Sequence, residues 1–424
     1  MAEGLALKIE AFLGRRAFLF LQGPPGPLAF QLGQAMRQRG VEIHRINICA
    51  GDQIDWPEQA TNYRGRFEDW AIFVDSFLRE HRITDVLLFG DCRPYHVAAR
   101  RIASLRGIST HVLEEGYLRP HWMTLELEGV NAYSPLRRDK EWFIEQARHL
   151  RPEPDSPPIT ASFRRRVRDA AWHYSASFLG AFAFPHYRSH RSASFVSEMM
   201  GWSWRFVVRG SHDRAAGRVI RRLRYEKVFL LPLQLSGDYQ IRNHSPFPDM
   251  PAATAFVLES FAAHAPGDAH LLIKKHPLDC SFFDWSSFVA GRARKLGIAD
   301  RVHYIDGGDL ERLVNKIAGM VCVNSTSATL GLQAGKPVCA LGDAVYKMPG
   351  LTYSHHIDQF WTNPVPPEPG LYEAFRRTLV DRSLVRGGLA SESAVATLVE
   401  NMVKRLTSTA LPYSVSSQAF TPAK

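Results

Sequence analysis

The chain of 424 residues contains no run of about 18 or more uncharged apolar residues, the length that a helix needs to cross a bilayer. We therefore expect no transmembrane helix. Glu3, Lys8 and Glu10 precede the first apolar stretch, which is not the pattern of a secretory signal peptide. The five cysteines are scattered along the chain: Cys49, Cys92, Cys280, Cys322 and Cys339. Their number is odd and their spacing is not that of a metal site, which favours reduced thiols in a cytoplasmic protein.

Two phosphate-binding signatures are missing as well. Residues 23–27, Gly-Pro-Pro-Gly-Pro, stand where a Rossmann glycine fingerprint would follow the first strand. Three prolines delete the backbone N–H donors that such a loop uses, so this is not a dinucleotide fingerprint. No Asp-x-Asp motif for a metal ion occurs either.

Positive charge is concentrated in one region of an otherwise ordinary composition. Hydrophobic residues make up 45% and charged residues 22%, the balance of a soluble globular protein with about two or three domains. Of the net charge of +10, nearly all lies in residues 151–225, where 14 arginines accompany five acidic residues. Aromatic residues are interleaved with these arginines, which suits an anionic membrane surface. A solvated helical face over core aromatics is an equally open interpretation, whereas no nucleic-acid motif occurs and no nucleic-acid partner is expected.

Apolar runs alternate with helix-like stretches in two parts of the chain. In the first part we expect strands at 17–21, 41–46, 85–89 and 110–114, and helices at 28–39, 67–80 and 96–105. In the second part we expect strands at 227–232, 271–275, 302–305, 320–323 and 338–341, and helices at 251–263, 310–318 and 326–334. This alternation predicts parallel sheets with helices on both faces.

The predicted fold class is therefore α/β and GT-B-like, with two Rossmann-like domains facing a cleft and a helical, basic insert between them. The expected division is an N-terminal Rossmann-like domain (1–135), the insert (136–225), a second Rossmann-like domain (226–350), helices packing back (351–408) and a flexible tail (409–424). In such sheets ligands bind beyond the carboxyl ends of the strands.

Three short motifs stand at the carboxyl ends of predicted strands. They are Glu114-Glu115-Gly116, His276-Pro277 and Ser325-Thr326-Ser327. In this order they resemble the motif set of CMP-sugar-using glycosyltransferases of the sialyl- and polysialyltransferase kind. The flanks at 89–96, 112–120 and 231–238 resemble capsule polysaccharide proteins of the KpsS/LipB type, and this resemblance covers roughly residues 15–360.

The resemblance implies a retaining transferase that moves Kdo (3-deoxy-D-manno-octulosonic acid) from CMP-Kdo to lysophosphatidylglycerol or a Kdo-lipid. It also implies a protein on the cytoplasmic, anionic surface of the inner membrane, among other capsule biosynthesis and export proteins. Because a CMP-sugar has one phosphate to neutralise, no cofactor and no metal ion are expected. The sequence leaves open a transferase for a sialic or other nonulosonic acid, and a non-catalytic assembly scaffold.

The acidic pair supplies the first candidates for catalysis. A retaining transfer by double displacement needs a carboxylate nucleophile and then a general base, whereas a direct inverting transfer needs only a base. The family pattern usually has Asp at the position of Glu115, so Glu114 and Glu115 both remain candidates for the nucleophile. Asp91 is a third candidate, with a helix N-cap as its alternative role. Arg119 is expected to bind the Kdo carboxylate through its bidentate guanidinium.

The donor-side candidates share positions at strand ends of the second half. His276 is expected to hydrogen-bond the CMP phosphate or to donate a proton to it. The Ser/Thr cluster would provide hydroxyl and N–H donors at a helix start, with N-capping as its plain alternative. The full donor-side set is His276, Pro277, Gln234, Lys275, Ser325, Thr326 and Ser327, with Ser236, Asp238 and Lys274 as weaker candidates.

Overall fold

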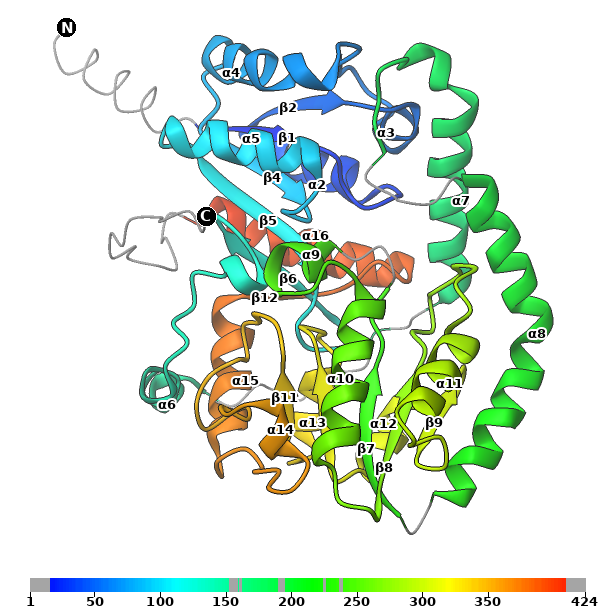
Figure 1. Ribbon diagram of the computed structural model, residues 1–424. Helices are drawn as coiled ribbons and strands as arrows, with labels where there is room; N and C mark the ends of the chain where they lie inside the picture. The colour runs from blue at the N-terminus through cyan, green and yellow to red at the C-terminus, as the bar shows by residue number, and fades with distance from the viewer. Residues whose placement is uncertain are drawn as a thin grey trace, which may run out of the picture.

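The computed structural model describes residues 16–151, 159, 162–189, 195–223, 226–235 and 239–408. Two sheets dominate it, one above the other in Figure 1. Ser236 and Asp238, and the tail expected at 409–424, lie outside the described residues. The boundaries proposed for the domains stay predictions.

The first sheet has seven strands in the order β12-β6-β5-β4-β1-β2-β3. Their bounds are β1 (Ala17–Phe20), β2 (Glu42–Asn47), β3 (Thr61–Asn62), β4 (Asp85–Phe89), β5 (Ser109–Glu115), β6 (Trp122–Leu127) and β12 (Leu384–Arg386). The strands from β1 to β5 pair in parallel, whereas β6 pairs antiparallel with β5 and β12 antiparallel with β6. The chain therefore returns to the first sheet after completing the second.

Helices cover both faces of this sheet. They are α2 (Leu28–Arg37), α3 (Ala50–Asp55), η1 (Phe67–Asp69), α4 (Trp70–Glu80), α5 (Pro94–Leu105), η2 (Asn131–Tyr133) and α16 (Glu392–Thr407). Phe18 and Phe20 of β1 share a core with α2 and α16, and Leu19 between them shares another with α4 and α5. Successive strand residues thus point into opposite cores, as the alternation of a strand requires.

The second sheet has five parallel strands in the order β11-β10-β7-β8-β9. Its strands are β7 (Lys227–Pro232), β8 (Ala269–Lys274), β9 (Val302–Ile305), β10 (Gly319–Cys322) and β11 (Val338–Ala340). Its helices are α9 (Tyr239–His244), α10 (Met250–His264), α11 (Trp285–Lys295), α12 (Leu310–Val314), α13 (Ala328–Gln333), α14 (Ile357–Phe360) and α15 (Leu371–Arg382). The near-continuous apolar run of β7 fits a parallel strand that is buried on both faces.

Along the chain, further helices follow η2 and precede β7, the first strand of the second sheet. They are α6 (Lys140–His149), α7 (Phe163–Leu179), η3 (Ala181–Ala183) and α8 (Phe195–Arg222). Figure 1 shows α7 beside the first sheet and α8 beside the second, together forming one long edge of the molecule. None of the helices in the described part of the chain combines the length and apolar character needed to cross a bilayer.

The structure confirms the α/β class with two sheets, and most expected elements agree with it within about two residues. The elements that were not predicted are α3, β3, β6, η2, α9, α11 and β12. The helix expected at 310–318 ends at Val314, and residues 351–408 contain β12 as well as helices.

Candidate functional site

Strand order locates a ligand-binding position in each sheet. In the first sheet the chain leaves β1 toward β2 on one side and later returns to β4 on the other. In the second, β7 lies between β8 and β10 in the same way. A position where the chain leaves a strand to one side and later returns to its other side is a topological switch point. Ligands of open α/β sheets bind there, beyond the carboxyl ends of the strands. The first switch point carries Gln22 and Arg93, and the second carries Gln234 and Asn324.

The carboxyl edges of the two sheets face each other. Thr329 at the start of α13 donates from Oγ1 to the carbonyl of Tyr117, at 3.2 Å, just past β5. Asn131 donates to Gln240 Oε1 at 3.2 Å and accepts from the backbone N–H of Val345 at 3.2 Å. These buried contacts bring the acidic motif of the first sheet next to the Ser/Thr cluster of the second.

Glu114 and Glu115 lie inside β5, paired with Thr124 and Met123 of β6, so their side chains point to opposite faces. Glu115 Oε1 forms an ion pair with the guanidinium of Arg166 on α7, at 2.6 Å, and 28% of its side chain is exposed. Glu114 faces the first switch point. Burial lowers the pKa of Arg93 there, and the charge of Glu114 opposes that shift.

Asp91 is completely buried, and its carboxylate has several partners. Oδ2 accepts from the backbone N–H of Val130 at 3.0 Å and from Arg100 at 3.2 Å, while Cys92 Sγ donates to Oδ1 at 3.2 Å. The N-cap role is wrong, because Arg93 occupies the N-cap of α5. In this structure Asp91 anchors the loop at 130 to the end of β4.

His276 and Arg119 come together from opposite sheets. Burial and the neighbouring charge of Arg119 lower the pKa of His276 to about 4, so the ring is neutral at physiological pH. Its Nδ1 accepts from the backbone N–H of Leu278 at 3.1 Å, which leaves the proton on Nε2. A neutral imidazole with Nε2–H can donate a hydrogen bond to an anionic oxygen. Pro277 is exposed beside it.

The Ser/Thr cluster lies between β10 and α13. The hydroxyls of Ser325 and Ser327 are 2.7 Å apart. Ser327 is the N-cap residue of α13, and its side chain makes no capping hydrogen bond. The hydroxyl of Ser325 instead accepts from the backbone N–H of Ser327 at 3.2 Å, so part of the cluster stabilises the start of the helix. Thr326 accepts at its carbonyl from Thr329 Oγ1 at 2.8 Å.

Gln234 exchanges two hydrogen bonds with Asn324. Its Nε2 donates to Asn324 Oδ1 at 2.8 Å, and the backbone N–H of Asn324 donates to its Oε1 at 3.1 Å. Because Gln234 is buried, this pair fixes the distance between the ends of β7 and β10. Gln234 therefore supports the second switch point.

Lys275 belongs to a cationic cluster around Asp306, at the ends of β8 and β9. Asp306 pairs with Arg205 at 2.9 Å, with His212 at 3.2 Å and with Lys275 at 3.7 Å. Burial lowers the pKa of the nearby Lys274. Sequence reasoning missed Arg205, His212 and Asp306, although the position of Asp306 directly after a predicted strand was an available signal.

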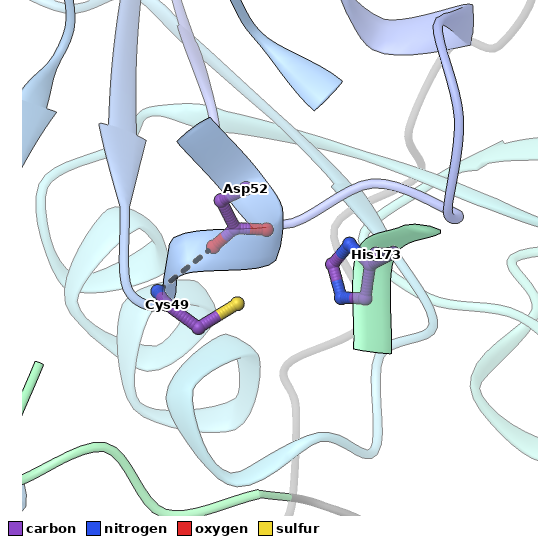
Figure 2. A group of neighbouring side chains, drawn as sticks. All are labelled: Cys49, Asp52 and His173. Carbon is purple, nitrogen blue, oxygen red and sulfur yellow. Dashed lines mark hydrogen bonds between the residues drawn. The ribbon is translucent and has the colours of Figure 1, made fainter. Parts of the chain in front are cut away.

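Two groups of buried side chains have the composition of a metal site. Figure 2 shows Cys49, Asp52 and His173, and the second group is Asp91, Cys92 and His244. The carboxylate of Asp52 already accepts from Gln22, from Arg45 and from two backbone N–H groups, at 2.9 to 3.3 Å. That of Asp91 is similarly engaged. A cation would have to displace these donors, so neither group fits a metal ion, and metal independence remains an expectation.

Two Rossmann-like α/β units with facing carboxyl edges define a protein of the GT-B class. The chain belongs to the family of capsule polysaccharide biosynthesis proteins, whose model matches residues 84–389. It is 33% identical over 383 residues to the capsule polysaccharide modification protein LipB of Neisseria meningitidis serogroup A, covering 88% of this chain and 91% of LipB. It is 30% identical over 387 residues to the capsule polysaccharide export protein KpsS of Escherichia coli, covering 90% and 98%. The suspected KpsS/LipB relationship is thus confirmed.

Similarity to solved structures is more distant. Thermosulfurimonas dismutans KpsC, a beta Kdo 2,7 transferase, is 15% identical with a TM-score of 0.44, and the match covers 91% of this chain and 99% of that one. At this distance the likeness carries no conclusion about the reaction.

Proposed function

We propose that this protein is a glycosyltransferase that transfers Kdo from CMP-Kdo to lysophosphatidylglycerol or a Kdo-lipid during synthesis of a capsular polysaccharide linker, with retention at the anomeric carbon. The observation that carries the proposal is the convergence of an acidic pair and a phosphate-type donor set on two facing sheet edges. Membership of the capsule polysaccharide family supports the substrate class.

The donor is proposed to bind at the second switch point. The Nε2–H of His276 and the hydroxyls of Ser325 and Ser327 would donate to the CMP phosphate. Lys275 would add positive charge, and Arg119 would face the Kdo carboxylate from the opposite sheet. The phosphate of a CMP-sugar is a phosphodiester with one negative charge and requires fewer cations than a diphosphate, so these groups are proposed to suffice without a metal ion.

The carboxylates of β5 are proposed to act at the anomeric carbon. One of them attacks that carbon while the bond to the phosphate oxygen breaks and CMP leaves with the electron pair. The acceptor hydroxyl then attacks the covalent intermediate, gives its proton to a general base, and releases the carboxylate. Glu115 is the favoured nucleophile because its side chain is partly exposed and held by Arg166.

The outer face of α7 and α8 is proposed to lie on the anionic inner membrane surface from the cytoplasmic side. Large apolar side chains are exposed along these helices and η3: Val167, Trp172, Phe178, Leu179, Phe182, Met199, Met200, Trp204, Phe206 and Val207. Exposed arginines accompany them: Arg164, Arg168, Arg209, Arg214, Arg218, Arg221 and Arg222. Exposed rings with cations suit the headgroup region of a bilayer.

Two arginines of the basic region at 151–225 have other partners and are not available to a membrane. Arg165 is buried and pairs with Asp169 and Glu392, at 3.2 and 2.6 Å. Arg166 pairs with Glu115. Reversing the charge of residues 164–166 would therefore disturb the fold and the site, so the membrane surface has to be tested on α8.

The test of the reaction is incubation of pure protein with a panel of donors and lysophosphatidylglycerol, followed by mass measurement of the lipid. Addition of one or more Kdo masses from CMP-Kdo is expected, without transfer from CMP-sialic acid. If only sialic acid were transferred, the proposed donor sugar would be wrong, but the assignment as a CMP-sugar-dependent transferase would stand. If no donor were turned over, the transferase proposal would fail, and a non-catalytic role in capsule assembly or export would be the alternative.

A further inference from the structure

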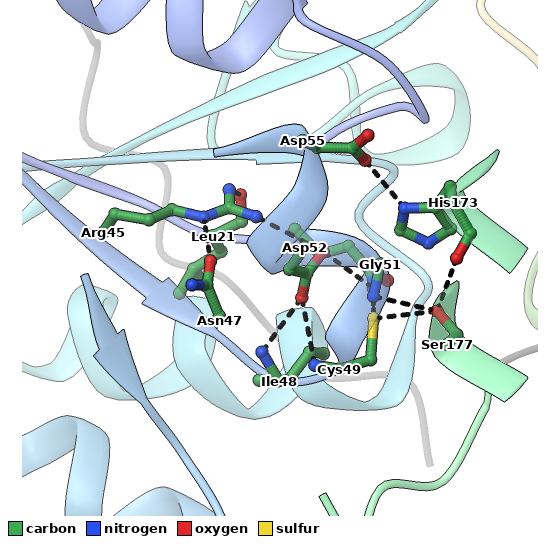
Figure 3. A network of polar contacts seen from close by, with 12 residues as sticks. Leu21, Arg45, Asn47, Ile48, Cys49, Gly51, Asp52, Asp55, His173 and Ser177 are labelled. Atoms are coloured by element: carbon green, nitrogen blue, oxygen red, sulfur yellow. Dashed lines mark hydrogen bonds and ion pairs between the residues drawn. The ribbon is translucent and has the colours of Figure 1, made fainter. Parts of the chain in front are cut away.

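Helix α7 connects a buried polar cluster to the candidate nucleophile. Its Arg166 pairs with Glu115, while seven and eleven residues later His173 and Ser177 contact α3. At 3.6 residues per turn these three positions lie along one side of the helix. Figure 3 shows the contact of α7 with α3, where His173 and Ser177 reach Asp55, Gly51 and Cys49.

We propose that Arg166 is a positioning residue for Glu115, and that the contact between α7 and α3 holds Arg166 in place. This inference rests on the proposed function, because it assigns Glu115 to the site. It adds a residue from outside both sheets to the machinery. It also gives the buried cluster of Cys49, Asp55, His173 and Ser177 a role that is not metal binding.

The first contact is an ion pair. His173 Nδ1 lies 2.7 Å from Asp55 Oδ2, and both side chains are at most 10% exposed. Burial by itself lowers the pKa of His173, but the hydrogen bonds with Asp55 and Cys49 outweigh this effect and raise the pKa to about 11. Asp55 also accepts from the backbone N–H of Gly26 at 3.0 Å. The imidazolium therefore joins α7 to α3 and to the proline-rich loop.

The second contact is a close approach of backbones. Ser177 Oγ accepts from the N–H of Gly51 at 3.2 Å and lies 3.5 Å from Cys49 Sγ. A Cβ on Gly51 would be 2.5 Å from the carbonyl oxygen of His173, and one on Gly180 would be 2.4 Å from Ala50 Cβ. Only glycine at these positions allows α7 to approach α3 so closely.

A fixed α7 sets the geometry at Glu115. Arg166 lies about 10 Å from His173 along the helix axis, as seven residues at the helical rise require. The side chain of Arg166 is 43% exposed, so its own packing does little to hold it. Small displacements of a reacting group cost about 10²-fold in rate, which is why a remote contact can matter here.

The test is a double-mutant cycle of Arg166→Gln and His173→Gln in the full-length protein. CMP release from CMP-Kdo in the presence of acceptor is expected to fall roughly 10-fold or more in each variant through kcat, with CMP affinity unchanged. The double variant should be no slower than the slower single variant, because both changes remove the same arrangement. Arg148→Gln is the control, since Arg148 forms a similar exposed pair with Glu145 at 2.8 Å.

A second readout does not require activity. Carbodiimide with an amine labels accessible carboxyl groups, and peptide mass spectrometry reports the labelling of Glu115. We expect faster labelling in Arg166→Gln and in His173→Gln, with no further increase in the double variant. The inference would be overturned if labelling of Glu115 were unchanged in both single variants. It would also be overturned if the loss of kcat in the double variant equalled the product of the two single losses. If wild type lacked turnover, the proposed function would fail, and the labelling result would still decide the role of Arg166.

Discussion

At the scale of single residues, His276 is neutral because it is buried beside cationic side chains. Its low pKa predicts that His276 adds nothing to the pH dependence of CMP affinity between pH 5.5 and 8, since the ring does not titrate in that window. The CMP phosphate itself titrates at about pH 6, so wild type and His276→Ala should share the same pH profile. His276→Ala, and Ser325→Ala combined with Ser327→Ala, are each expected to weaken CMP binding about 10-fold. Calorimetric titration at several pH values measures both effects. Affinity that rises as pH falls through 6.5 in wild type but not in His276→Ala would contradict the neutral ring.

The acidic pair gives the second prediction at this scale. Glu114→Gln and Glu115→Gln should each leave the fold intact, because both side chains lie at the end of β5 and are partly exposed. At least one should lower transfer by about 10²-fold or more, with Glu115 the favoured one. Steady-state rates and circular dichroism on the same samples measure this. Near-normal rates in both variants would make the acidic pair structural and contradict the proposed mechanism, since the carboxylate of Asp91 is buried and already engaged.

Residue roles were only partly readable from the sequence. Strand-end position predicted the place of His276 and the Ser/Thr cluster, because a short apolar run shows where a strand ends. It could not show that Gln234 is paired with Asn324 or that Asp91 accepts from the backbone of Val130, since these partners are distant in the chain. The ion pair of Glu115 with Arg166 was equally hidden.

At the scale of elements, the parallel strands other than the two-residue β3 were predictable, whereas the antiparallel strands β6 and β12 were not. β7 and β8 are apolar runs flanked by turns, a pattern that local sequence carries. β12 has three residues, and its pairing with β6 depends on a chain return of more than 250 residues. No periodicity signals such a pairing.

The contact of α7 with α3 predicts a pH-dependent stability. The folded pKa of His173 is about 11, above its ordinary value near 6.5. The stabilisation is therefore complete below pH 6.5 and declines as pH rises toward 11. Thermal unfolding at pH 6 and pH 9 should show a larger loss for wild type than for His173→Gln. Equal losses would mean that the ion pair does not contribute.

At the scale of the whole molecule, α7 and α8 form one edge that spans both units (Figure 1). Apolar rings and arginines are exposed on these helices. We expect binding to phosphatidylglycerol vesicles that weakens with salt, because each basic residue contributes about 1 kcal/mol that salt screens. Phe206→Ser and Arg214→Glu with Arg218→Glu should weaken it, and Leu105→Ser, an exposed apolar control on α5, should not. Co-sedimentation at low and high salt measures this. If wild type and all variants bound the vesicles equally, the proposal that α7 and α8 contact the membrane would be wrong.

The central claim is that the facing edges of the two sheets form one CMP-sugar transferase site. The most direct measurement is CMP release from CMP-Kdo with lysophosphatidylglycerol present, for wild type, Glu115→Gln and His276→Ala at matched concentration. The claim predicts turnover by wild type, loss of turnover with retained CMP binding in Glu115→Gln, and weaker CMP binding in His276→Ala. Wild-type protein that binds neither CMP nor CMP-Kdo and releases no CMP would contradict it.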